Sequence, residues 1–164
     1  METKTLELKD IVGYLAYGLH CLNCDNMIEE IEFDNVGNLI RGIDLQDEAE
    51  YDDWVACQQY KPILRPLSDL YKTITHNGKE IVPIVELAKM HRPEYKWFFD
   101  ETCACCEREK FNYFNGFNAG SFNGKVCNQH QLFDYLHELK IDYRGLIDAG
   151  LAVDVNTLEI NPYK

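Results

Sequence analysis

The stretch MIEEIEFDNVGNLIRGIDL, residues 27–45, decides the fold class. Apolar and acidic residues alternate on both sides of the segment 34–37, as is typical of strands with one buried and one solvated face. The Asn and Gly residues of that segment favour a turn between two strands. The sequence therefore predicts an antiparallel hairpin with strands at 27–33 and 38–45 and acidic side chains in water.

Helical and extended patterns continue along the chain on both sides of this hairpin. Apolar residues at helical spacing, together with capping and stop signals, predict helices: 9–19 with its end near Gly18, a short helix from Asp47, 68–74, one turn at 86–90, 128–140 capped by Asn128, and a segment from Asp142 to Gly150. Proline pairs or short apolar runs predict extended segments: 61–67, 81–85 and 152–155. His76-Asn-Gly78 is predicted to be a turn.

These elements predict one globular domain over residues 1–164 with an α+β fold. In this fold an antiparallel hairpin and further short strands pack against several short helices. A chain of 164 residues is long enough to form its own core, because a folded domain of this size buries roughly 70% of its unfolded surface.

The net charge of −12 is concentrated in one segment. Residues 25–53 hold eleven acids and one base, Arg41. Such a field repels phosphate backbones and anionic lipids, which disfavours direct binding to nucleic acid or to a membrane surface. We interpret the segment as a solvated face, as a docking surface for a protein with a basic surface, or as a mimic of nucleic-acid charge. The candidate contacts are Glu48, Glu50, Asp52 and Asp53.

The N-terminal residues and the cysteine usage predict a cytoplasmic protein. Residues 1–10 lack the basic start and apolar run of a secretory signal, and no later stretch has the length and apolar character of a membrane span. Seven cysteines, an odd number without a secretion signal, indicate reduced thiols.

A segment rich in Phe, Asn and Gly covers residues 111–124. This composition predicts a loop or an irregular hairpin. Its aromatic side chains either lie buried under the loop or form an exposed binding patch, for which Phe114 and Phe117 are the candidates.

Cysteine spacing predicts a candidate zinc site. Cys103 and Cys106 form a C-x-x-C pair, and Cys127 and His130 form a C-x-x-H pair at a helix start. Four such ligands would complete a closed tetrahedral site, which is structural rather than catalytic. Against this hypothesis, Cys105 places a further thiol inside the first pair, and free cysteines are often simply buried.

Motifs that carry catalysis are missing from the sequence. The chain has no Walker sequence, no H-E-x-x-H and no G-x-S-x-G. A cysteine and a histidine are present, but the two must meet in space before they indicate a nucleophile.

Two blocks of the sequence carry a family resemblance. KPILRPLSDL, residues 61–70, and LFDYLHELKIDYRGLIDAGLAV, residues 132–153, resemble those of small uncharacterised proteins encoded by Bacteroidales bacteria and their phages. The resemblance implies a cytoplasmic protein of bacterial or phage origin. It implies no catalytic residue, because that group has no established activity, and the cysteine pairs lie outside both blocks.

The leading hypothesis from the sequence is a non-catalytic binding or interaction protein, a bacterial or phage accessory factor that acts through the acidic segment or the aromatic loop. It requires no cofactor. One alternative is a zinc-stabilised structural module, and another is a small enzyme of unrecognised type.

Overall fold

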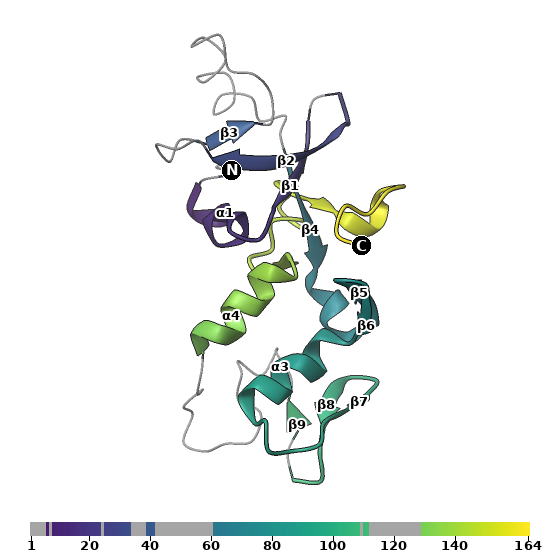
Figure 1. Cartoon of the computed structure of the whole chain (residues 1–164). Coiled ribbons are helices and arrows are strands. Elements are labelled where there is room, and N and C mark those ends of the chain that lie inside the picture. The colour runs from purple at the N-terminus through teal and green to yellow at the C-terminus, as the bar shows by residue number, and fades with distance from the viewer. Residues whose placement is uncertain are drawn as a thin grey trace. The chain divides into compact units, whose positions relative to one another are not determined.

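The computed structural model describes residues 6, 8–23, 25–33, 39–41, 61–108, 110–111 and 129–164 (Figure 1). The chain forms two compact units. The first unit comprises residues 1–66 and 142–162, and the second comprises residues 67–141 and 163–164. The predicted α+β class, with an antiparallel hairpin, further short strands and short helices, is confirmed. The single domain over residues 1–164 stays a prediction.

The first unit is built on a mixed β-sheet (Figure 1). The strand order is β10-β4-β1-β2-β3, and β11 pairs with β4 in parallel. The bounds are β1 (His20–Leu22), β2 (Ile28–Phe33), β3 (Leu39–Arg41), β4 (Lys61–Pro66), β10 (Ile141–Asp142) and β11 (Val153–Asp154). Strands β2 and β3 pair antiparallel, with Ile31 opposite Arg41, so the predicted antiparallel pairing is confirmed as far as Arg41. The predicted turn at 34–37 and the predicted helix from Asp47 lie outside the described residues.

Helix α1 (Leu8–Leu15) supplies one side of the first core. The core cluster comprises Ile11, Tyr14, Leu15, Leu19, Cys21, Ile31, Leu64, Leu146 and Ala152. The sequence predicted a helix as far as Leu19, which is wrong by one turn. Gly18 has a φ of +69° and turns the chain out of the helix, so that Leu19 reaches the core from the following segment.

The segment after Asp142 is a series of turns, and the helix predicted there is wrong. Gly145 has a φ of +73°, which interrupts any helix five residues before Gly150, itself at +73°. The Asp142 carboxylate accepts hydrogen bonds from the Leu146 and Ile147 amides at 2.9 and 2.8 Å. The Leu151 amide donates to the Leu146 carbonyl at 2.8 Å, which is the type of hydrogen bond that glycine often allows at the end of a helix.

The second unit is made of short helices and two small sheets (Figure 1). Its elements are η1 (Leu67–Tyr71), β5 (Ile74–His76), β6 (Lys79–Ile81), α3 (Pro83–His91), β7 (Phe98–Asp100), β8 (Cys103–Cys105), β9 (Lys110–Phe111) and α4 (Gln129–Glu138). The predicted turn between β5 and β6 is confirmed, with Asn77 and Gly78 both at positive φ. A 3₁₀ helix, η1, replaces most of the helix predicted at 68–74.

Helix α3 corrects another sequence prediction. We predicted a strand at 81–85 and one helical turn at 86–90, whereas a continuous helix runs from Pro83 to His91. Pro83 suits the first helical turn, and Ile84, Leu87 and His91 are buried at helical spacing. The short apolar run before Glu86 therefore belongs to a helix.

Helix α4 is close to its prediction. It begins at Gln129, one residue after the predicted cap, and buries Leu132 and Leu136. Lys140 follows the helix with a φ of +58° and ends it. Among the described residues, no helix has the length and apolar character that crossing a membrane demands.

Candidate metal centre

Strands β7, β8 and β9 form a three-stranded antiparallel sheet in the second unit. A two-residue turn, Glu101 and Thr102, joins β7 to β8, and it places Asp100 opposite Cys103. Glu101 has a φ of +36°, in the left-handed region that tight turns between strands require. The hairpin therefore fixes the register of the residues on either side of this turn.

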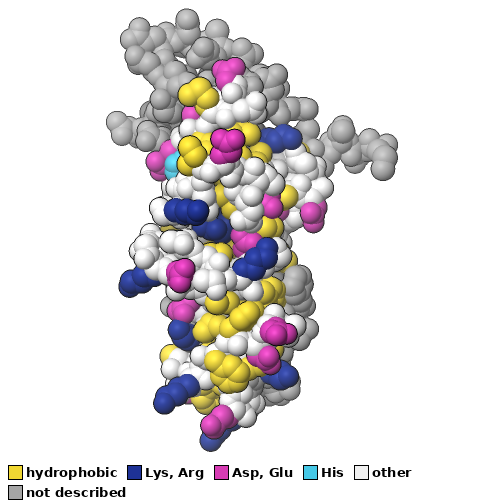
Figure 2. Space-filling model, turned by 90° about the vertical axis from the view of Figure 1, so that its right-hand side faces the viewer, with side chains coloured by type: hydrophobic (Ala, Val, Ile, Leu, Met, Phe, Trp, Pro, Cys, Tyr) yellow, Lys and Arg dark blue, Asp and Glu magenta, His cyan; other side chains and the backbone are white. Residues whose placement is uncertain are grey.

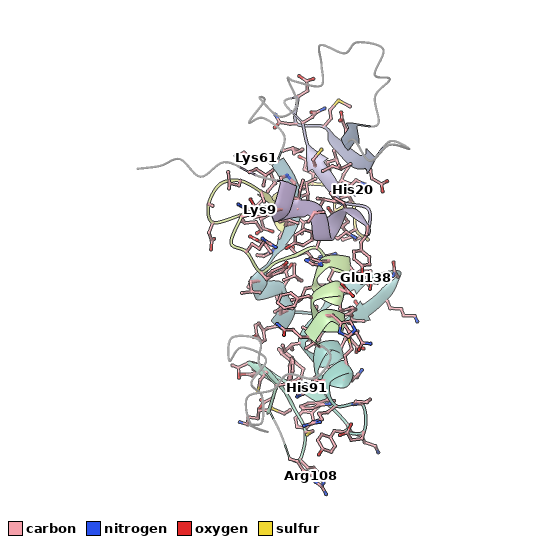
Figure 3. The ribbon with its side chains drawn as sticks, turned by 90° about the vertical axis from the view of Figure 1, so that its left-hand side faces the viewer. Lys9, His20, Lys61, His91, Arg108 and Glu138 are labelled. Atoms are coloured by element: carbon pink, nitrogen blue, oxygen red, sulfur yellow. The ribbon has the colours of Figure 1, made fainter. Side chains whose placement is uncertain are left out.

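Aromatic packing holds this sheet against α3. Phe111 is fully buried, and its ring lies 5.4 Å from the His91 ring and 6.4 Å from the Trp97 ring, measured between centroids. The Trp97 indole N–H donates to the Arg92 carbonyl at 2.9 Å. His91 and Arg108 mark this part of the molecule in Figure 3. Strand β8, which carries the cysteines, therefore belongs to a sheet that is packed against α3.

Three metal-binding side chains converge on the β7–β8 hairpin. The Sγ atoms of Cys103 and Cys105 lie 3.2 Å apart, and both cysteines are buried. An Asp100 carboxylate oxygen lies 3.7 Å from the Cys105 sulfur. The three donor atoms all lie within 4.8 Å of one another, so Asp100, Cys103 and Cys105 form a group that could hold a metal ion.

The environment of Cys105 disfavours its ionisation in the absence of a metal. Burial raises the pKa of the Cys105 thiol to about 11, and the neighbouring Cys103 and Asp100 add to the rise. A thiol with this pKa is protonated at neutral pH and is a weak nucleophile. Cys105 is therefore not an activated thiolate in the metal-free protein.

The residues predicted as zinc ligands differ in burial and in whether they join the converging group. Cys103 belongs to the converging group, whereas Cys106 follows β8, is half-buried and is not part of that group. His130 is exposed in the first turn of α4. Cys127 lies outside the described residues, so the convergence of these four ligands stays a prediction.

Asp100 was not singled out from the sequence, and Cys105 was counted there as evidence against the zinc site. Cys105 was regarded as an extra thiol within the C-x-x-C pair. On a strand, however, a C-x-C spacing places the side chains of Cys103 and Cys105 on the same face. Glu101 and Thr102 are not typical central residues of a two-residue hairpin turn, which favours Asn-Gly, Asp-Gly or Gly-x. If residues 98–105 had been predicted as a hairpin, Asp100, Cys103 and Cys105 would have been expected on one face of it.

The predicted partner-binding residues cannot be placed. Glu48, Glu50, Asp52, Asp53, Phe114 and Phe117 lie outside the described residues.

A second polar cluster joins the β5–β6 hairpin to the end of α4. His76 Nε2 lies 2.9 Å from a Glu138 carboxylate oxygen. Burial, followed by the nearby Glu86 and Glu138 carboxylates, raises the pKa of the Tyr135 phenol well above its ordinary value. This cluster ties two elements of the second unit together.

Comparison of the chain with protein-family models, with curated proteins and with solved structures finds no match. The functional argument therefore depends on the residues themselves.

Proposed function

We infer a function for this protein from the net charges of its two units, which differ sharply. The first unit contains 18 acidic and 6 basic residues, whereas the second contains 10 of each. The whole net charge of −12 therefore belongs to the first unit. In Figure 2, acidic and basic side chains lie interspersed where Figure 1 shows α3 and β7–β9.

We propose that this protein is a non-catalytic binding protein whose first unit recruits a protein partner with a basic surface. The observation that carries the proposal is the confinement of the net charge to one unit. A concentrated negative field attracts a basic surface, speeds the encounter and repels nucleic acid. The resemblance of residues 61–70 and 132–153 to proteins of Bacteroidales and their phages supports an accessory role in such a host.

A defined basic probe tests this proposal. Binding of a fluorescently labelled peptide rich in lysine and arginine is measured by anisotropy at low and at physiological salt. Charge reversal at four acids of the first unit should weaken binding by about tenfold or more. These substitutions are Glu48→Lys, Glu50→Lys, Asp52→Lys and Asp53→Lys.

A matched control distinguishes the effect of where the reversed charges lie from the effect of the total net charge. Four exposed acids of the second unit are reversed, which changes the net charge by the same amount: Glu80→Lys, Glu94→Lys, Glu107→Lys and Asp134→Lys. The proposal predicts that this control binds the peptide more tightly than the first variant. Equal weakening in both variants, or unchanged binding in the first, would contradict a docking role for the acidic segment.

The convergence of donor atoms at the β7–β8 hairpin favours a second candidate, a zinc-stabilised module. Zinc is the metal that cysteine-rich structural sites most often hold, and such a site stabilises its fold directly. Protein purified without added zinc is analysed for metal and for freely titrating thiols. One equivalent of zinc supports this candidate, whereas substoichiometric metal with seven free thiols would refute it.

A further inference from the structure

Strand geometry decides which thiols of the Cys103–Cys106 segment can share one ion. Successive side chains of a strand point to opposite faces, so residues i and i+2 share a face and residues i and i+3 do not. Cys103 and Cys105 are the two ends of β8, and their sulfurs lie 3.2 Å apart. Cys106 comes one residue later and does not join them. The C-x-C pair, and not the C-x-x-C pair, therefore forms the dithiol.

The hairpin brings an oxygen donor to the same face. Asp100 is the register partner of Cys103, and side chains directly opposite in an antiparallel pair lie on one face. Its carboxylate reaches the Cys105 sulfur at 3.7 Å. Asp100 is exposed while both cysteines are buried, so the group opens toward solvent on the carboxylate side.

The spacing of the three donors is close to that of a tetrahedral zinc site. With Zn–S bonds of about 2.3 Å and a Zn–O bond of about 2.1 Å, two sulfurs lie about 3.8 Å apart and a sulfur and an oxygen about 3.6 Å. The hairpin has 3.2 Å between the sulfurs and 3.7 Å between sulfur and oxygen. Binding would require the two sulfurs to separate by about 0.6 Å, which a rotation of the Cys side chains can supply.

We propose that the β7–β8 hairpin binds one zinc ion through Asp100, Cys103 and Cys105, and that Cys106 is not a ligand. This assignment rests on the zinc-stabilised module as the function of the hairpin and replaces the ligand set predicted from the sequence. Two thiolates favour a borderline-soft ion over Mg²⁺ or Ca²⁺, which prefer oxygen ligands. The three side chains leave the fourth tetrahedral position to water or to another donor.

Titration of the full-length, metal-free protein with Co²⁺ and then with Zn²⁺ tests the assignment. Tetrahedral cobalt bound to thiolates absorbs strongly, and zinc displaces it, so both affinities are measured in one experiment. Cys103→Ser, Cys105→Ser and Asp100→Asn should each weaken zinc binding by more than about tenfold, because each removes a direct ligand. Cys106→Ser is the matched control, one residue away from Cys105, and should retain the affinity of the unmodified chain.

Different outcomes distinguish the assignment from the zinc-stabilised module. If Cys106→Ser abolishes binding while Cys105→Ser and Asp100→Asn retain it, the module stands and this ligand set is overturned. If the unmodified chain binds neither ion, both are overturned. Far-UV circular dichroism of each metal-free variant, and Cys→Ala variants at the same positions, separate the loss of a ligand from a failure to fold.

Discussion

The two units of this protein organise their interiors in different ways. The first unit has strands of six residues, β2 and β4, and a helix that together enclose one apolar cluster. In the second unit the described strands have two or three residues each. The second unit buries apolar side chains of its helices, such as Ile84, Leu87, Leu132 and Leu136, and has aromatic contacts around Phe111.

This contrast explains where a metal would be most useful. Short strands supply few ladder hydrogen bonds, and a small sheet needs packing or a crosslink to be stable. The candidate ligands lie in the unit that has no described strand longer than three residues, while the only described cysteine of the first unit, Cys21, belongs to the apolar core. A structural ion would therefore compensate for what the short strands lack.

The largest expected effect comes from removing apolar volume in the first unit. Leu64 is fully buried in its core cluster. Leu64→Ala should lower the free energy of unfolding of that unit by about 2–5 kcal/mol, because it removes apolar contacts and leaves a cavity. Denaturant unfolding monitored by circular dichroism measures the change.

Zinc binding provides the control for this substitution. The proposed ligands belong to the second unit, so Leu64→Ala should leave the affinity for added zinc, measured on the folded protein, unchanged. If Leu64→Ala also lowered the affinity for zinc, the two units would not be independent of each other. The contrast between them would then be wrong.

A pair of glycines, one in each unit, gives a smaller effect. Gly18 and Gly78 have nearly the same positive φ, +69° and +70°. A Cβ at position 18 would lie 2.9 Å from a Glu30 carboxylate oxygen, whereas a Cβ at position 78 would meet nothing within 4 Å. Each Gly→Ala substitution should cost about 1–2 kcal/mol of unfolding free energy through backbone strain.

The end of the Glu30 side chain can move aside, so Gly18→Ala should cost only slightly more than Gly78→Ala. The two variants are compared by thermal unfolding. A much larger loss for Gly18→Ala would show that Glu30 is held in place more firmly than an exposed side chain should be.

The smallest expected effect is the alkaline behaviour of Tyr135. Its pKa is raised in the folded protein, so the unfolded chain loses this proton first as the pH rises. The associated stability is complete below pH of about 10 and declines above it, by about 1 kcal/mol at most over the first pH unit. Tyr135→Phe should remove this decline, as measured by denaturant unfolding between neutral and alkaline pH.

Tyr17→Phe is the matched control, because Tyr17 is exposed on the first unit. It should leave the alkaline decline in place. If both variants flatten the pH dependence equally, the decline does not originate in the second unit.

Much of the fold followed from local signals. Four local patterns each specify an element through backbone geometry. They are the alternation at 27–45, the prolines at 62 and 66, the Asn-Gly turn at 77–78 and the apolar arc of residues 132–139. The errors occurred where a tertiary contact overrides a local pattern. Residues 81–85 look like a strand, yet Ile84 and Val85 are buried as part of a helix that begins at Pro83.

The site was only partly predictable from the sequence. Cys103 was identified, but choosing between Cys105 and Cys106 as its partner requires knowing that the segment is a strand. Asp100 joins the group only through the hairpin register, and no spacing rule for metal ligands indicates it. The net charge of residues 25–53 was predictable from the sequence alone, because net charge does not depend on the fold.

The parallel pairing of β4 with β11 has a consequence for how the protein folds. Val153 pairs with Ile63, and the entire continuous part of the second unit lies between them in the chain. The first unit cannot complete its sheet until Asp154 has left the ribosome, whereas residues 67–141 can begin to fold earlier. Because closing a shorter loop costs less entropy, an early-folding insert would bring the two halves of the first unit together at lower cost.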